Sequence, residues 1–167
     1  MSAFARCDHL TSLTFEGGIS KFASDAFAYC TALKTVAFQP GTTTIGGNTF
    51  TGCTALESVT IPEGVTSIGG AAFYGCQALI TIDFPESVAS LGPSVIDFCP
   101  AMTDCYFHHT TPLNITSKTF YESTRQQLTL HVPSGCKAQY ATAEYWKDFK
   151  EIVDDIPSTA ISPVLTN

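Results

Sequence analysis

Charged residues are scarce in this 167-residue chain, and acidic residues outnumber basic ones. Lysine and arginine together number 8 against 15 aspartates and glutamates, which leaves a net charge of −7. Nucleic-acid binding and docking on anionic membranes both need clustered basic residues, so the composition argues against both. The chain has no apolar run of about 18 residues, which argues against membrane insertion by this segment. Its length is that of one domain, and residues 1–20 carry no signal-peptide pattern.

Cysteine, in contrast, is frequent and regularly spaced. The chain has seven cysteines, and five of them recur at intervals of 23 residues: Cys7, Cys30, Cys53, Cys76 and Cys99. Metal sites and catalytic motifs do not produce four identical intervals. A fixed period of about 20 to 30 residues is typical of stacked-repeat solenoids, and we therefore predict that architecture.

Other apolar residues recur in step with these cysteines. Six residues after each cysteine stand Leu13, Val36, Val59, Ile82 and Cys105. Twenty residues after the first four cysteines stand Phe27, Phe50, Phe73 and Ile96. A single unit cannot bury such residues, but stacked units with parallel strands about 4.8 Å apart can. We expect these columns, together with the cysteines, to face one continuous core.

Within a unit, the pattern predicts a strand, a turn and a second short apolar segment. The strand is about five residues long and ends where proline and glycine follow, as at Pro62–Gly64, because proline cannot donate to a strand ladder. A second apolar pair, such as Val65 and Ile68, comes next. The last third, Ala71–Cys76, predicts one tight helical or 3₁₀ turn that is too short to be stable without its neighbours.

The third unit reads Leu56-x-x-Val59-x-Ile61-Pro62-x-x-Val65-x-x-Ile68-x-x-x-Ala72-Phe73-x-x-Cys76. This pattern resembles the BspA-like (Treponema pallidum type) leucine-rich repeat, and the resemblance covers roughly residues 2–153. It implies an α/β solenoid: a right-handed leucine-rich repeat superhelix with parallel β-sheets, short helical or 3₁₀ turns and a strand-helix C-terminal cap. A proline turn replaces the usual Asn or Cys after the strand, so we expect no asparagine ladder.

We expect leucine-rich repeats over residues 1–127, a C-terminal cap over 128–153 and a linker or tail over 154–167. The chain begins within a partial repeat, residues 1–6, because Ala3–Cys7 matches Ala26–Cys30 position by position. An open solenoid end exposes its core. We therefore expect the chain to belong to a longer array, or its first coil to pack on something else. The expected state is a monomer, with end-to-end association at this end as the alternative.

The regular period fails after Cys99, and a different pattern begins. A strand-like run over residues 128–132 ends at Pro133, and a helical pattern follows from about Cys136 to Lys150. Its apolar face consists of Tyr140, Trp146, Phe149 and Ile152. The closing segment of BspA-like proteins has a similar strand, helix and Trp-Lys-Asp-Phe stretch, which implies that Trp146 closes the core.

The cysteines are expected to be structural. Neighbouring cysteines of a stack lie within disulfide reach, but their shared orientation gives poor bridging dihedrals. Free cysteine behaves as a small buried hydrophobe. We expect the five periodic cysteines to be reduced and buried, Cys105 to lie in the core, and Cys136 to be partly exposed.

Two arrangements of cysteine and histidine could carry chemistry. Cys105, His108 and His109 are zinc-ligand types, but Cys105 faces inward and no fourth ligand is evident. Cys136 and His131 flank a Pro-Ser-Gly turn, and no third group is placed to orient them. We therefore expect no metal and no cofactor.

Asp83 and Asp104 are the remaining candidates for catalysis, because they occupy outward strand positions in neighbouring units. Hydrolysis with paired carboxylates needs acids on one face. Two acids on a sheet surface are more often solvated than catalytic. We therefore expect that the chain is not an enzyme.

The outward strand positions are small and polar over most of the chain, as at Ser12, Thr35, Ser58 and Thr81. They become more varied toward the C-terminal end. An aromatic residue beside acids and histidines makes this end the best candidate for a contact surface. The candidate partner-binding residues are Ile80, Asp83, Asp104, Tyr106, His108 and His109.

The family resemblance implies a non-catalytic extracellular protein-interaction or adhesion module of a bacterial leucine-rich repeat protein, at the cell surface or secreted. The implied partner is a protein, such as a host matrix or cell-surface protein, or a glycan. The alternative is a structural spacer or stalk that presents another domain. A spacer should have equally uniform outward positions in every coil, so the varied last coils favour binding.

Overall fold

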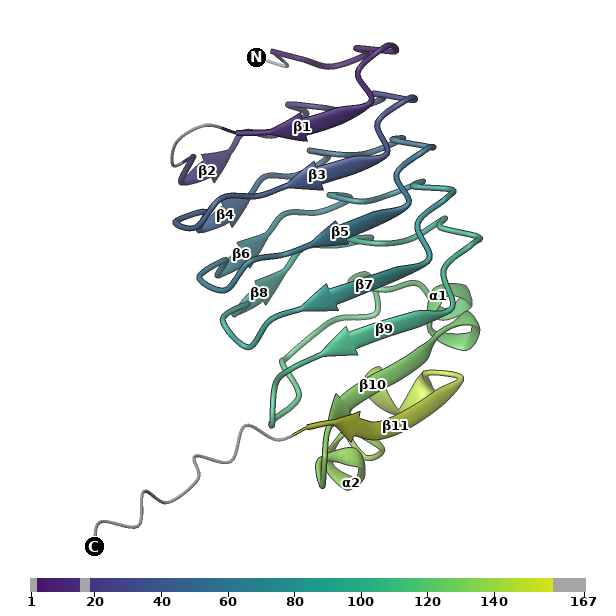
Figure 1. The fold of residues 1–167 in the computed structure, drawn as a ribbon. Helices are drawn as coiled ribbons and strands as arrows, with labels where there is room; N and C mark the ends of the chain where they lie inside the picture. Colours follow the sequence, from purple (N-terminus) through teal and green to yellow (C-terminus); the bar gives the residue numbers. More distant parts are fainter. Residues whose placement is uncertain (1–2, 16–18, 158–167) are drawn as a thin grey trace, which may run out of the picture.

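The computed structural model describes residues 3–15 and 19–157. Its strands stack in parallel along one axis (Figure 1). The larger sheet has seven strands in the order β1-β3-β5-β7-β9-β10-β11, and the smaller has four in the order β2-β4-β6-β8. The larger sheet consists of β1 (Ser12–Thr14), β3 (Thr35–Ala37), β5 (Ser58–Thr60), β7 (Thr81–Phe84), β9 (Asp104–Phe107), β10 (Thr129–Pro133) and β11 (Glu151–Ile156).

The strand register equals the sequence period. Thr35 pairs with Ser12 on one side and with Ser58 on the other, so each strand residue pairs with its counterpart one repeat away. Val36 and Val59 are buried between these outward polar positions. The alternation of a pleated strand explains why a repeated apolar column becomes a buried one.

The second apolar segment of each unit contributes a strand to the smaller sheet. Its strands are two residues long: β2 (Lys21–Phe22), β4 (Thr44–Ile45), β6 (Ser67–Ile68) and β8 (Ser90–Leu91). Ile45 and Ile68 pair in register and are buried. Each of these coils therefore contributes one strand to each sheet, and the two sheets face each other across the core.

The last third of each coil is a run of turns: over Ala71–Cys76, the predicted tight turn is present as two i→i−3 hydrogen bonds, from the Tyr74 and Cys76 N–H groups, without a continuous 3₁₀ helix. Two residues of this run have left-handed backbone angles, with φ of 54° at Ala71 and 69° at Gly75. Between them, the Phe73 N–H donates to the Val95 carbonyl of the next coil at 2.9 Å. The N–H groups of Ala71, Phe73 and Gly75 thus donate to the next coil, whereas a helix would satisfy all of them locally.

Columns of aromatic residues and of cysteines fill the core between the two sheets. The rings of Phe4, Phe27, Phe50 and Phe73 stack nearly parallel, with centroids 5.4 to 5.6 Å apart. The Cys76 thiol donates to the Phe50 carbonyl at 3.3 Å, and Cys30, Cys53 and Cys99 make the equivalent bond in their own coils. Each of these thiols therefore links its own coil to the preceding one.

The cysteines are free, and all but Cys7 are buried. Burial raises the pKa of Cys53 to about 12 and that of Cys99 to about 11, because a thiolate would lose its hydration there. The expectations for Cys105 and for four of the five periodic cysteines are confirmed, whereas Cys7 is only partly buried. The prediction for Cys136 is wrong, because Cys136 is buried at the start of the second helix.

The C-terminal region contains α1 (Glu122–Gln127), α2 (Lys137–Tyr140) and the 3₁₀ helix η1 (Trp146–Asp148). The predicted helix over 136–150 is wrong, since only two short helical segments lie in that range and Tyr145 between them has a φ of 65°. The predicted strand is present as β10. The sequence patterns did not predict α1 or β11.

Trp146 closes the core, as predicted. It is fully buried, lies 4.7 Å from Phe107 and 5.3 Å from Tyr140 between ring centroids, and donates its indole N–H to the Leu113 carbonyl at 2.8 Å. The expected start of the tail at Asp154 lies inside β11, which continues to Ile156. The remainder of that tail, residues 158–167, and residues 1–2 of the partial repeat lie outside the described residues.

Candidate partner-binding surface

The candidate surface lies where the larger sheet meets the cap. In the parallel register, Asp83 on β7 is opposite Tyr106 on β9, and Tyr106 is opposite His131 on β10. Asp104 is two residues before Tyr106 on the same side of β9. The strand alternation therefore brings an acid, a tyrosine and a histidine into one row, with a second acid beside it.

His131 is the centre of this row. Its Nε2 lies 3.0 Å from Asp104 Oδ1, and its Nδ1 lies 2.9 Å from Asp155 Oδ1 on β11. Its ring also stacks on Tyr106, with centroids 4.4 Å apart and planes 15° from parallel. One imidazole thereby joins β9, β10 and β11 on the outer face of the sheet.

The carboxylates change the titration of their neighbours. Partial burial opposes charge on His131, but the hydrogen bonds that its ring donates to Asp104 and Asp155 outweigh this effect and raise the pKa of His131. The pKa of Asp104 is lowered by the Thr103 hydroxyl and by His131. Burial and then the three acids Asp104, Asp155 and Asp83 raise the pKa of Tyr106.

A second histidine pairs with the first acid of the row. His108 Nε2 lies 2.8 Å from Asp83 Oδ1 at the end of β9, and both side chains are partly open to solvent. A shallow cavity of about 260 Å³ adjoins this pair. Its lining consists of Asp83, Tyr106, His108, Asp155, Ile156 and Pro157.

The structure separates the six predicted residues into two groups. Asp83, Asp104, Tyr106 and His108 lie together on the outer face, and Ile80 is 54% exposed just before β7. His109 does not belong to the surface, which corrects the expectation: it is 8% exposed and stacks on Phe107 with centroids 4.7 Å apart. It continues the alternation of β9 inward, and burial lowers its pKa.

The sequence reasoning missed four residues of this site: His131, Asp155, Ile156 and Pro157. The alternation of the predicted strand at 128–132 was a usable signal for His131, because Leu130 and Val132 on either side are buried. Asp155 and Ile156 had no such signal, since they stand in a segment that reads as a tail. We name His131, Asp155, Asp104, Tyr106, Asp83 and His108 the cap-edge surface.

The arrangement does not bring together the cysteine and histidine residues considered for a metal site or a nucleophile. Cys105 and His109 are buried on the inner side of the sheet while His108 faces outward, so the three cannot share a metal ion. Across the part of the chain that the structure describes, no three His, Cys, Asp or Glu residues are grouped so as to hold one. Both nitrogens of His131 face carboxylates, which leaves neither for Cys136.

Asp83 and Asp104 do not form a carboxylate pair. Asp83 engages His108, and Asp104 engages His131, so each acid has its own histidine. The surface consists of histidine–carboxylate contacts and one stacked aromatic.

A profile of the BspA type leucine-rich repeat region matches six copies over residues 1–136. The chain belongs to this family. The match covers the coils and the first cap strand, which are the segments that carry the buried columns. No curated protein matches the sequence.

Solved structures share the fold of this BspA-type chain. The T. pallidum leucine-rich repeat protein TpLRR is 24% identical with a TM-score of 0.64, and the alignment covers 84% of this chain and 64% of that protein. The pneumococcal vaccine antigen PcpA is 16% identical with a TM-score of 0.62, and the alignment covers 87% of this chain and 44% of the antigen. The chain thus spans less than two thirds of each, and the likeness establishes a parallel β-solenoid of leucine-rich repeat type.

Proposed function

We propose that this chain is a non-catalytic extracellular interaction or adhesion module of a bacterial cell-surface leucine-rich repeat protein, and that the cap-edge surface contacts its partner. Membership of the BspA-type family supports this role, since repeat solenoids commonly bind through their extended faces. The pneumococcal neighbour is a vaccine antigen, which fits an exposed location. Among the described residues, no helix has the length and apolar character to cross a bilayer.

The observation that carries the proposal is the clustering of exposed charge and aromatic surface at one end of an otherwise uniform sheet. Outward residues of β3 and β5 are small: Thr35, Ala37, Ser58 and Thr60. From β7 onward, the same rows hold Asp83, Asp104 and Tyr106, with a cavity beside them. The partner we expect is a protein, such as a host matrix or cell-surface protein, that offers cationic side chains to these acids.

The test is binding of the purified chain to an array of host matrix and cell-surface proteins. The double variant Asp83→Ala/Tyr106→Ala should lose the captured partner, because it removes the Asp83–His108 contact and the stacked ring. The matched control is Thr35→Ala/Ser58→Ala on the same face of β3 and β5, which should bind like the unmodified chain. Binding that survives the first double variant, or that the control abolishes, contradicts the assignment of the cap-edge surface.

A structural spacer is the second candidate, and the uniform outward rows of the first coils favour it. A spacer needs a rigid stack and no ligand, and coil-to-coil hydrogen bonds on three edges supply that rigidity. In that case, the array captures nothing above background, while the chain retains its cooperative unfolding. The same experiment therefore separates the two functions.

A further inference from the structure

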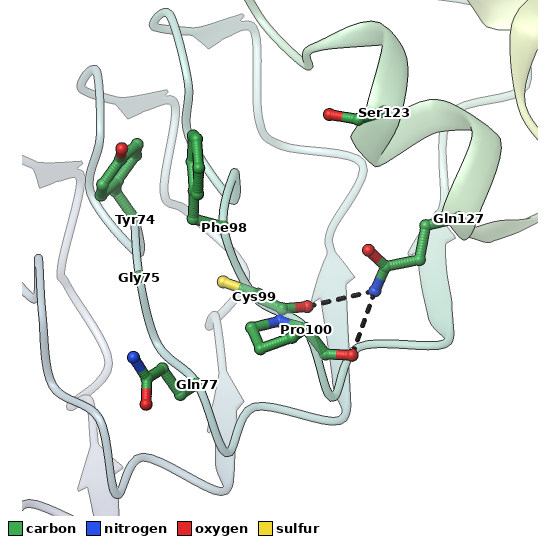
Figure 2. Close-up of a pocket in the computed structure, with 8 residues that line it drawn as sticks. All are labelled: Tyr74, Gly75, Gln77, Phe98, Cys99, Pro100, Ser123 and Gln127. Carbon is green, nitrogen blue, oxygen red and sulfur yellow. Dashed lines mark hydrogen bonds between the residues drawn. The ribbon is translucent and has the colours of Figure 1, made fainter.

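A cavity of about 510 Å³ lies outside the cap-edge surface, where the turns of two coils meet α1 (Figure 2). Its lining includes Tyr74, Gln77, Phe98, Pro100, Ser123 and Gln127. None of these residues belongs to the cap-edge surface. The two surfaces can therefore be altered independently.

Aromatic rings form one wall of this cavity. Tyr74 and Phe98 lie side by side with centroids 5.0 Å apart and planes 42° from parallel, as Figure 2 shows. Tyr121, outside this lining, contacts the Phe98 ring edge to face with centroids 6.4 Å apart. Phe98 is 62% exposed, so its ring is available to a ligand.

Phe98 occupies a position that disfavours it. The residue before each periodic cysteine has a left-handed backbone, with φ of 70° at Gly52, 69° at Gly75 and 58° at Phe98. Glycine adopts this conformation without strain, whereas a bulky side chain does not. Because the Phe98 ring faces solvent, core packing does not account for its presence there. Tyr29 shares this conformation and exposure, and what distinguishes Phe98 is that its ring lies beside Tyr74 and lines the cavity.

Fixed polar groups stand opposite the rings. The Gln127 side-chain N–H₂ lies 2.6 Å from the Met102 carbonyl, 3.2 Å from that of Cys99 and 3.4 Å from that of Pro100. These bonds hold the amide, and its oxygen points away from Pro100 in Figure 2. That oxygen accepts no hydrogen bond from the described residues. The exposed Gln77 amide and Ser123 hydroxyl add donors and acceptors nearby.

The lining contains no charged side chain, although the chain as a whole has a net charge of −7. Aromatic faces with a few placed amide and hydroxyl groups suit a ligand that is flat and apolar on one side and rich in hydroxyls at its edge. A neutral sugar ring has both properties. A proline-rich peptide also docks on aromatic walls, but proline has no N–H for the Gln127 acceptor. We propose that the cavity between Tyr74, Phe98 and Gln127 binds a neutral oligosaccharide.

The test is a glycan array that carries neutral, sialylated and sulfated oligosaccharides, followed by titration of the strongest neutral hit against the whole chain. Phe98→Gly should weaken that binding by about tenfold or more, because it removes the stacking face. Its unfolding free energy should be unchanged or higher, since glycine stands at this position in the two preceding coils. A retained fold separates loss of the site from loss of structure.

Tyr29→Gly is the matched control, because Tyr29 has a φ of 60° and is exposed at the same repeat position, outside the cavity. Tyr29→Gly and Asp83→Ala/Tyr106→Ala should both bind the oligosaccharide like the unmodified chain. Three outcomes overturn the proposal: no neutral glycan binds, Phe98→Gly binds normally, or decaproline displaces the sugar and binds more tightly.

Discussion

Asp97 accepts a hydrogen bond from the Thr124 hydroxyl at 2.5 Å, between the last regular coil and the first helix of the cap. The same oxygen, Oδ1, accepts the Tyr121 backbone N–H at 2.9 Å. Tyr121 stands at the N-cap of α1, and its own side chain makes no capping bond. One buried carboxylate from the repeat stack therefore caps the helix that begins the C-terminal closure.

Asp97→Ala should lower the free energy of unfolding by about 2–4 kcal/mol, because it leaves the Thr124 hydroxyl and the Tyr121 N–H without their acceptor. Asp97→Asn keeps an acceptor oxygen at that place and should cost less. Urea denaturation of the three proteins measures both differences. An alanine variant as stable as the aspartate would show that the bond does not hold the cap to the coils.

Phe73→Ala should cost about 3–5 kcal/mol, since it opens a cavity in the middle of the stacked phenylalanine column. Phe4→Ala in the same column should cost less than about 1 kcal/mol, because Phe4 is 54% exposed and truncation there removes little buried area. Denaturant unfolding measures the pair. A cost below about 1 kcal/mol for Phe73 would contradict the register of the core.

Thiol labelling of the native protein at neutral pH should modify Cys7 rapidly and the other cysteines slowly. Cys7 is the partly exposed one, whereas burial raises the pKa of the thiols of Cys53, Cys76 and Cys99 and keeps them protonated. Mass spectrometry should find one fast label, none in Cys7→Ser, and labelling of all seven cysteines after denaturation. Fast labelling of the periodic cysteines in the folded state would contradict the buried column.

The His131 bridge should make stability depend on pH in a defined direction. The folded-state pKa of His131 lies above its ordinary value of 6.5, so its stabilisation is complete below that value and is lost as the pH rises through the folded-state pKa. The pKa of Asp104 lies below its ordinary 3.8, so the contribution of Asp104 is present above that value and is lost as the pH falls through its folded-state pKa.

His131→Gln should therefore destabilise the chain by about 1–2 kcal/mol near pH 6 and by less at high pH. The expected loss is modest because Asp155 is half exposed, and solvent weakens its interaction with His131. Urea denaturation of the variant and the unmodified chain, from pH 6 upward, measures the difference in unfolding free energy. Asp155→Asn should weaken the pH dependence, because one of the two carboxylates is then neutral. A cost of His131→Gln that grows as the pH rises would rule out the protonated bridge.

The sequence predicted the coils well because each repeat position has one neighbour above and one below. The pairing of Val36 with Val59 and the stacking of Phe50 on Phe73 follow from a single offset of 23 residues. The turn segments were harder, since left-handed residues such as Ala71 and Ser94 are not marked by glycine. In the cap, β11 escaped prediction because its pairing with β10 has no counterpart in the repeats.

The cap-edge surface was predictable in part, for the same reason. Asp83, Asp104 and Tyr106 lie in outward columns, so their neighbourhood follows from the strand register. His109 was misplaced because it follows β9 and still continues the inward alternation of that strand. His131 and Asp155 belong to β10 and β11, and the positions of these strands depend on how the cap folds over the last coil. The repeat period therefore could not place them in the site.

The sequence by itself determined the solenoid, its register and its buried columns, because repetition turns a local pattern into contacts at a constant offset. The tertiary structure alone decided the contacts between segments that do not repeat: Asp97 with Thr124, His131 with Asp155, and Phe98 with Tyr121. These contacts depend on the path of the chain after Cys99, where no shared period relates one residue to its neighbour in space.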